Sequence, residues 1–306
     1  MSGTANTTTW TILGVLKWTA QRFAERGLPS PRLDAELLAG HAFGLSRIAL
    51  YTDFDRPLSP DELDRYRGLV KRRLAGEPVA YLTGRKEFWN LELAVDARVL
   101  IPRPETETLI EATLDVIGPK TPTDDGAQSP ASGLRLWDVG TGSGAIALTL
   151  KHERPALEVF ASDLSPDALA VATANAERLA LGVSFELGHL LSPFAHAAPF
   201  DIIVANLPYV PRGEIPDLSP EVRSEPVSAL DGGPDGLELM AALVAAAPAR
   251  LRPLGVLVLE LGQGQAAAVM EQCRAAGFAA LTAHRDLAGI ERVVVARRTD
   301  AGQEVA

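Results

Sequence analysis

The residues best suited to chemistry form a short run directly after an apolar segment at 200–205. The run is Asn206-Leu207-Pro208-Tyr209, which joins an uncharged amide, a turn proline and an aromatic ring. The nitrogen of an amide, or of an exocyclic amino group, is a weak nucleophile because its lone pair is delocalised. The side-chain oxygen of Asn206 and the backbone carbonyl of Leu207 can each accept one N–H of such a group, which would hold the nitrogen in line with an electrophilic methyl group.

The other two residues of this run support the same interpretation. Pro208 stiffens the turn, and Tyr209 can stack on a planar substrate. We therefore expect all four residues to bind substrate and to carry the catalytic function.

A glycine-rich turn earlier in the chain predicts a nucleoside site. It follows an apolar run and precedes a run of good helix formers, which is typical of a buried strand, a tight turn and a helix N-terminus. Glycines let the backbone approach a ligand closely, and the helix start offers free N–H groups. Asp163 ends the next predicted strand and is placed to accept both hydroxyls of a ribose. The turn residues expected to contact the nucleoside are Gly140, Thr141, Gly142, Ser143 and Gly144.

The glycine pattern alone does not choose the nucleoside. With Ala145 as the third small residue, Gly140 and Gly142 also satisfy a dinucleotide fingerprint. The tighter rhythm of three glycines, with Asp138 just before it, resembles the first motif of the S-adenosylmethionine methyltransferases.

Composition narrows the class of protein. The 306 residues are enough for two domains, and 47% hydrophobic with 22% charged residues is an ordinary globular balance. The net charge of −10 argues against a protein that grips a phosphate backbone through bulk charge. A single cysteine, Cys273, rules out a disulfide framework and a cysteine-rich metal site, so we expect no metal and a reducing compartment. We expect no signal peptide and no membrane span.

The periodicity of apolar residues predicts the helices and strands that carry these sites. Helical spacing with capping signals predicts helices over 9–26, 30–44 and 59–76, and period-two alternation over 78–101 predicts a β-hairpin. Apolar strands alternating with helices follow, which indicates a parallel sheet covered on both faces. Ligands in such sheets bind beyond the carboxyl ends of the strands, where Gly140, Asp163, Gly188 and Asn206 all fall, so we expect Asn206 to contact the cofactor as well as the substrate. Residues 118–133 have no large apolar side chain and are expected to form a surface loop.

Five segments taken in order resemble one known family. They are IPRPETE, DVGTGSGAIAL, NLPY, EPVSALDGGPDGL and DLAGIERVV, and the helical stretch PRLDAELL and AYLTGRKEFW also match. This set is similar to the release-factor glutamine methyltransferase family (HemK/PrmC), over nearly the whole chain.

The resemblance implies a cytoplasmic enzyme that uses S-adenosylmethionine and yields S-adenosylhomocysteine. Its expected substrate is the side-chain amide nitrogen (N5) of the glutamine in the Gly-Gly-Gln motif of class 1 peptide chain release factors. It also implies an α/β fold with a seven-stranded, mostly parallel Rossmann-like methyltransferase sheet. The expected domains are a small N-terminal helical domain for substrate docking (1–77), a β-hairpin linker (78–101) and the methyltransferase domain (102–306).

Two departures from the family pattern keep alternatives open. The family usually reads Asn-Pro-Pro-Tyr, whereas Leu207 stands at the second place here; by the resemblance that residue contributes only its carbonyl. Asn-Leu-Pro-Tyr also occurs in ribosomal RNA adenine dimethyltransferases, so an adenine-N6 methyltransferase acting on RNA or DNA is the alternative. The turn Gly188-His189-Leu190-Leu191 lacks the acid that often holds the adenine amino group, and Leu191 is expected to pack on the adenine face instead.

A third hypothesis is a nicotinamide-dependent oxidoreductase that uses the same glycine turn, although no hydride-transfer acid or base is evident near Asn206. The release-factor hypothesis fits the acidic chain best, and it calls for no stable nucleic-acid partner. Its mechanism is a direct transfer that needs orientation and electrostatics rather than a strong general base.

Overall fold

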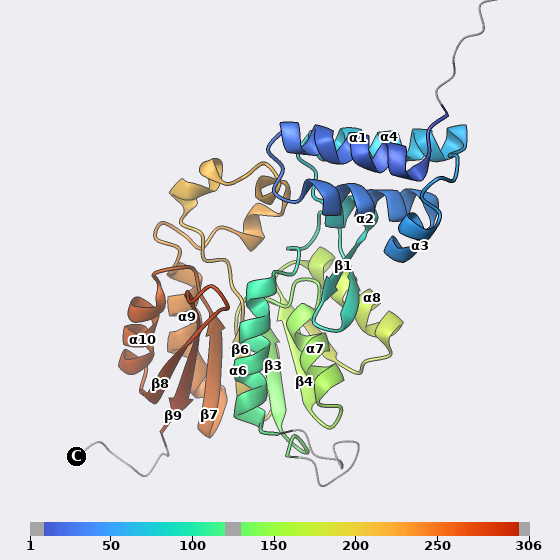
Figure 1. Cartoon of the computed structure of the whole chain (residues 1–306). Helices are drawn as coiled ribbons and strands as arrows, with labels where there is room; N and C mark the ends of the chain where they lie inside the picture. The colour runs from blue at the N-terminus through green and yellow to red at the C-terminus, as the bar shows by residue number, and fades with distance from the viewer. Residues whose placement is uncertain (1–8, 120–129, 300–306) are drawn as a thin grey trace, which may run out of the picture. The chain divides into compact units, whose positions relative to one another are not determined.

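The computed structural model describes residues 9–119 and 130–299 (Figure 1). The expected loop at 118–133 therefore lies mostly outside the described residues. The chain divides into two compact units, one of Met1–Gly84 with Ser219–Ser224 and one of Arg85–Leu218 with Glu225–Ala306. None of the helices in the described part of the chain is long and apolar enough to cross a membrane.

The first unit is helical. Its helices are α1 (Ile12–Glu25), α2 (Pro31–Phe43), α3 (Arg47–Thr52), α4 (Pro60–Leu74) and α5 (Val79–Thr83). Their starts follow the sequence signals: the Thr11 side chain caps α1, and Ser59 with Glu62 forms a capping box ahead of α4. Fully buried side chains such as Ile12, Phe23 and Leu38 form its core.

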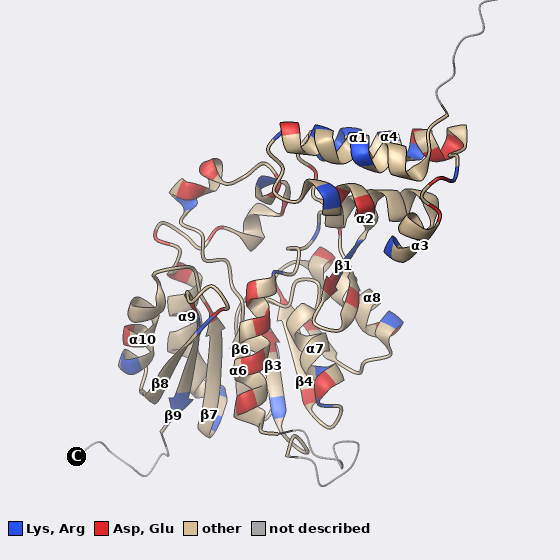
Figure 2. Ribbon diagram, in the orientation of Figure 1, with Lys and Arg blue, Asp and Glu red and all other residues tan. Residues whose placement is uncertain are grey.

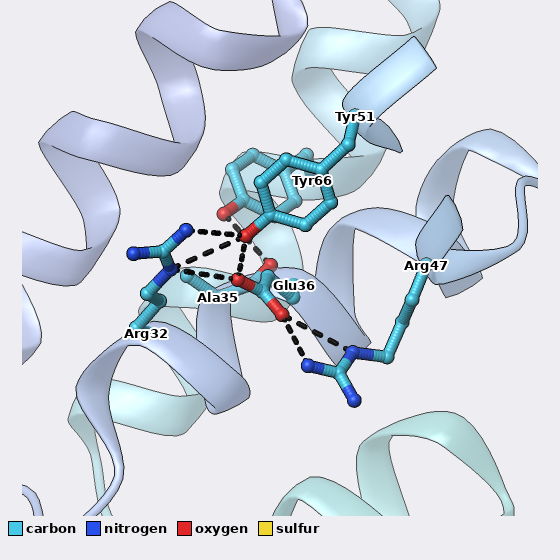
Figure 3. A network of polar contacts seen from close by, with 6 residues as sticks. All are labelled: Arg32, Ala35, Glu36, Arg47, Tyr51 and Tyr66. Atoms are coloured by element: carbon cyan, nitrogen blue, oxygen red, sulfur yellow. Dashed lines mark hydrogen bonds and ion pairs between the residues drawn. The ribbon is translucent and has the colours of Figure 1, made fainter. Parts of the chain in front are cut away.

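Buried polar groups tie the helices of this unit together. Glu36 on α2, 3% exposed, accepts hydrogen bonds from Arg47 at 2.7 and 3.1 Å, from Arg32 at 3.0 Å and from the Tyr51 hydroxyl (Figure 3). Arg73 on α4, 2% exposed, binds Asp34 and also Glu221 of the inserted 219–224 segment. A buried charge is tolerated only when it is paired, so these pairs fix the packing of the unit.

The hairpin is shorter than the expected 78–101 segment. Strands β1 (Arg85–Phe88) and β2 (Leu91–Ala94) pair antiparallel, whereas residues 79–83 form helix α5. Pro78 precedes that helix, and Gly84 ends it in the left-handed conformation, so residues 79–83 form a helical turn instead of the expected strand.

The second unit contains the predicted seven-stranded, mostly parallel sheet, with strand order β5-β4-β3-β6-β7-β9-β8. The five parallel strands are β3 (Arg135–Val139), β4 (Glu158–Asp163), β5 (Ser184–Leu187), β6 (Phe200–Ala205) and β7 (Leu251–Glu260). β9 (Glu291–Arg298) pairs antiparallel with both β7 and β8 (Phe278–Arg285).

Helices cover both faces of this sheet, as alternate side chains of each strand require. Leu136, Ile202 and Val258 belong to one core with residues of α6 (Glu107–Ile117) and α7 (Ala145–Glu153). Trp137, Ile203 and Leu257 belong to the other with residues of α9 (Glu238–Ala246) and α10 (Ala266–Ala275). Helix α8 (Pro166–Leu179) contacts β4 and β5. Short 3-10 turns are Pro104–Thr106, Arg212–Asp217, Val222–Ser224, Val227–Ala229 and Ala247–Ala249.

Candidate active site

A cavity of about 300 Å³ lies at the carboxyl ends of β3, β4 and β6. Val139 is the register partner of both Ser162 and Ala205, so the residues that follow these strands meet at one edge of the sheet. The predicted residues that line the cavity are Gly140, Thr141, Gly142, Ser143, Asp163, Asn206, Leu207 and Pro208. Three predicted residues, Gly144, Leu191 and Tyr209, are not part of its lining.

The glycine turn has the backbone shape that the sequence suggests. Gly140, Gly142 and Gly144 all have positive φ, at 79°, 57° and 85°. A Cβ on Gly142 would meet nothing within 4 Å, and Gly142 is one of the residues that line the cavity. A Cβ on Gly144 would instead lie 2.9 Å from Leu148, so this glycine permits helix packing rather than ligand approach.

Asp163 is joined to the glycine turn and to the next helix. One carboxylate oxygen accepts the Gly142 N–H at 2.9 Å, and the other accepts the Ser165 N–H at 2.9 Å. A carboxylate has about four lone-pair sites, so each oxygen retains one for a ligand hydroxyl. The two backbone bonds therefore hold the half-buried carboxylate in the geometry a ribose would need.

Asp138 stabilises the glycine turn through hydrogen bonds. It is fully buried, and its carboxylate accepts the Thr141 hydroxyl at 2.7 Å and the Ala147 N–H at 3.1 Å. Burial raises the pKa of Asp138 to about 7, against the effect of these two hydrogen bonds. The carboxyl group thus couples the end of β3 to the first turn of α7.

Asn206 directly follows β6, and its amide is oriented by Thr106. Nδ2 of Asn206 donates to Oγ1 of Thr106 at 3.2 Å, and Thr106 is 4% exposed. This bond engages the nitrogen end of the amide and orients the Asn206 side chain at the edge of the cavity, which both residues line. Leu207 is buried, and its Cδ2 would lie 3.0 Å from a Cβ on Gly140, so the two predicted sites are in van der Waals contact.

Tyr209 is held by the glycine-rich segment of the EPVSALDGGPDGL motif. A Cβ on Gly236 would lie 2.2 Å from the Tyr209 carbonyl oxygen, and one on Gly232 would lie 2.7 Å from that of Pro208. Gln265 also donates to the Tyr209 carbonyl at 3.0 Å. Burial raises the pKa of Tyr209 to about 12, so its hydroxyl stays neutral. The backbone of Tyr209 is thus held by the surrounding segments, and Tyr209 is not among the residues that line the cavity.

The adenine end of the predicted site differs in detail from expectation. Leu190, with φ of 46°, lines the cavity together with Gly188 and His189. Leu191 packs in the apolar core on the Trp137 face of the sheet. The role expected for Leu191 stays a prediction, and its neighbour Leu190 is an apolar residue of this turn that lines the cavity.

Three polar residues near the site were not assigned roles from the sequence. Thr106 lies in IPRPETE, where it reads as a helix start; Glu225 opens the EPVSALDGGPDGL motif; and Glu260 ends an apolar strand. Of these, Glu260 could have been proposed as a site residue from the sequence, because it falls at the carboxyl end of a parallel strand, as Asp163 and Asn206 do. Asp201, also at β6, instead pairs with Arg252 at 2.9 Å and accepts the Arg135 N–H, which gives it a structural role.

Comparison with known proteins agrees with this geometry. A family model described as "Methyltransferase domain" matches residues 137–224, and one described as "PrmC N-terminal domain" matches residues 14–84. A solved methyltransferase from Pyrococcus furiosus shares the fold, with a TM-score of 0.51 at 16% identity over 75% of this chain and 97% of that one. The sheet, the glycine turn and the cavity define an S-adenosylmethionine-dependent methyltransferase.

Full-length relatives identify the family. A release factor glutamine methyltransferase from Geobacter sulfurreducens is 42% identical over 289 residues, which covers 94% of this chain and 97% of the relative. One from Moorella thermoacetica is 40% identical over 298 residues, which covers 95% and 99%. The chain belongs to the release factor glutamine methyltransferase family.

Proposed function

We propose that this protein transfers a methyl group from S-adenosylmethionine to the side-chain amide nitrogen, N5, of the glutamine in the Gly-Gly-Gln motif of class 1 peptide chain release factors. The observation that carries the proposal is that two sites share one cavity: Asn206 and Leu207 line it together with the glycine turn, and the Leu207 side chain lies next to Gly140. An amide bound by that pair would lie next to a nucleoside bound by the turn.

The residues present fit the cofactor. Gly142 lines the cavity and has nothing within 4 Å of where a Cβ would lie, and Asp163 presents two oriented carboxylate oxygens for ribose hydroxyls. Gly140, Thr141 and Ser143 would contact the rest of the cofactor, and Leu190 or Leu191 would contact the adenine. When bound, the sulfonium supplies the electrophilic methyl group, and S-adenosylhomocysteine is the product.

The protein's part in the reaction is orientation. Asn206 Oδ1 and the Leu207 carbonyl each accept one N–H of the glutamine amide, which turns the nitrogen lone pair toward the methyl group. A cofactor held by the glycine turn and Asp163 would supply the methyl group to this nitrogen and would leave as S-adenosylhomocysteine, and the methylated amide would release one proton to water. Pro208 fixes the turn that presents the Leu207 carbonyl, and Tyr209 braces it.

We propose that the helical unit, about residues 1–77, docks the release factor. Its surface exposes large apolar side chains, with Ile48 77% and Trp18 53% exposed, and such side chains commonly mark protein contacts. Replacing Ile48 and Trp18 by serine should raise KM for the release factor without changing the affinity for S-adenosylmethionine. An unchanged KM in both variants would remove the docking role from these side chains.

We also propose that the protein is cytoplasmic and has no stable nucleic-acid partner. Acidic residues recur at four-residue spacing along α6 at Glu107, Glu111 and Asp115, with no lysine or arginine on that helix (Figure 2). Together with the net charge of −10, this favours a protein substrate over a phosphate backbone.

The proposal is tested by methyl transfer from labelled S-adenosylmethionine to a purified class 1 release factor. Label should enter the Gly-Gly-Gln protein and not a Gly-Gly-Ala variant. Methylation of the Gly-Gly-Ala variant, or of an adenine-containing RNA in its place, would contradict the assignment.

A further inference from the structure

Glu260 is a buried carboxyl group beside the amide-binding residue. It ends β7, and Leu259 just before it is the register partner of Ala205, the residue before Asn206. Glu260 and Asn206 therefore leave neighbouring strands at the same edge of the sheet. Glu260 is 1% exposed, and its Oε2 has no hydrogen-bond partner among the described residues.

Thr106 and Asn206 link this carboxyl group to the cavity. The side chains of both residues interact with Glu260 and lower its pKa, and Asn206 Nδ2 donates to Thr106 Oγ1 at 3.2 Å. Thr106 and Asn206 line the cavity, whereas Glu260 does not. The carboxyl group thus stands one layer behind the residue that is proposed to hold the substrate amide.

Among the residues that the structure describes, two charged groups act on Glu260, Arg292 on β9 and Glu105 in the 3-10 turn before α6. Tyr209, whose hydroxyl is neutral, is a third titratable group close to it. Arg292 is already paired with Asp286 at 3.1 Å. Burial raises the pKa of Glu260 to about 7; Thr106, Arg292 and Asn206 lower it and Glu105 raises it.

The chemistry of an amide explains what such a group can do. The two ends of the asparagine side chain have nearly the same shape, so packing alone does not decide which end faces the cavity. An ionised carboxylate only accepts hydrogen bonds, so it selects the arrangement in which Nδ2 points toward it. A protonated carboxyl also donates, and it can satisfy the reversed amide as well.

We propose that Glu260 is a positioning residue for methyl transfer: acting directly and through Thr106, its carboxylate holds the Asn206 amide with Nδ2 inward and Oδ1 toward the substrate nitrogen. The inference rests on the proposed function, because Oδ1 is needed only if an amide N–H is bound there. It predicts that transfer is fastest when Glu260 is ionised.

The test is single-turnover methylation of a Gly-Gly-Gln release factor across pH 5.5–9, at saturating cofactor, roughly spanning the titration of Glu260. The wild-type rate should rise through the pKa of Glu260. Glu260→Gln should lower the rate at the alkaline end by about tenfold or more and remove the dependence on Glu260 ionisation. Asp138 titrates in the same range, so the comparison of the two profiles, and not the wild-type limb alone, makes the assignment.

Matched variants separate positioning from structure. Thr106→Val removes the relay at constant shape and should slow transfer about as much as Glu260→Gln, whereas Thr106→Ser keeps the hydroxyl and should restore most of the rate. Asp201→Asn, at the opposite end of β6, should leave the rate and its pH profile unchanged. Calorimetry should show S-adenosylmethionine affinity within about twofold of wild type for all of them.

The results that would overturn the inference differ from the result that would overturn the proposed function. A folded Glu260→Gln protein with the wild-type rate and profile overturns the inference. If that variant does not melt cooperatively, equal rates for Thr106→Val and Thr106→Ser overturn it. A wild-type enzyme that does not methylate the Gly-Gly-Gln protein overturns the proposed function instead.

Discussion

Glu225 holds Arg103 in place although 122 residues separate them in the chain. The same carboxylate accepts the Ile101 N–H at 3.2 Å, and the Glu225 side chain is fully buried. Two segments singled out in the sequence, IPRPETE and EPVSALDGGPDGL, are therefore joined by one side chain. Because Thr106 belongs to the first of them, this pair also fixes the partner of Asn206.

Glu225→Ala should weaken both stability and catalysis. It leaves the buried Ile101 N–H without its acceptor, which costs about 1–3 kcal/mol, and it frees the segment that carries Thr106. Thermal unfolding should show a lower Tm, and the single-turnover rate should fall while S-adenosylmethionine affinity is kept. Glu214→Ala, in an exposed 3-10 turn, is the control. Wild-type Tm and rate in the Glu225 variant would contradict this view.

Asn206→Ala should abolish most catalysis, since orientation of a weak nucleophile is what the site provides. The expected loss is on the order of 10²-fold or more in single-turnover rate, by analogy with removal of one positioned polar group. Cofactor affinity should change much less than turnover. Asn206→Asp keeps an acceptor but adds charge, and it should also transfer slowly. An active Asn206→Ala enzyme would mean that the amide is held by other groups.

Leu207→Pro should leave turnover nearly unchanged. Proline keeps the carbonyl and lacks only the N–H, while the contact of the leucine side chain with Gly140 is lost. We therefore expect a rate close to wild type with a somewhat lower Tm. A folded variant that cannot transfer methyl groups would show that leucine contributes more than its backbone.

Asp163→Ala should remove two hydrogen bonds to the ribose, each worth roughly 1.5–3 kcal/mol because the acceptor is charged. It also leaves the Gly142 and Ser165 N–H groups without their acceptor, so the turn should loosen. Calorimetry should show much weaker S-adenosylmethionine binding. Asp167→Ala, on the first turn of α8, is the matched control. Unchanged affinity in the Asp163 variant would refute this ribose contact.

Stability should fall as pH rises from about 4 to 7. Asp138 and Glu260 have pKa values of about 7 in the folded protein, above their ordinary values of 3.8 and 4.5. In this window the folded state keeps protons that the unfolded chain has released, so deprotonation favours unfolding. For Glu260 the difference corresponds to about 3 kcal/mol at most. Urea titrations at pH 5 and 8 should show a smaller decline for Glu260→Gln, and equal declines would contradict the prediction.

The sequence predicted those parts of the site that local pattern controls. Gly140, Asp163 and Asn206 each follow a strand, and parallel strands end at one edge, so their convergence needed no knowledge of long-range contacts. Thr106 and Glu260 were different. Thr106 reaches Asn206 across 100 residues, and Glu260 looks like one polar residue in an apolar strand until its neighbours are known.

One local expectation was wrong, and the backbone conformation at a second position could not be predicted from the sequence. Residues 79–83 were expected within the hairpin, but Pro78 and Gly84 set the start and end of a helical turn there. Leu190 has a positive φ and lines the cavity, whereas Leu191 packs in the apolar core, and the expected contact of Leu191 with the adenine stays a prediction. A backbone angle of this kind leaves no mark in the residue types alone.

The strand order has a consequence for how the protein is made. β9 is the last strand of the sheet to be synthesised, yet it lies between β7 and β8. Until residues 291–298 leave the ribosome, one edge of β7 stays unpaired and β8 has no place in the sheet. A chain truncated in the β8–β9 turn would keep all the residues of the candidate site. It would still expose an unpaired apolar strand that is prone to aggregation. We expect cells to remove such a fragment by proteolysis rather than retain it as a weaker enzyme.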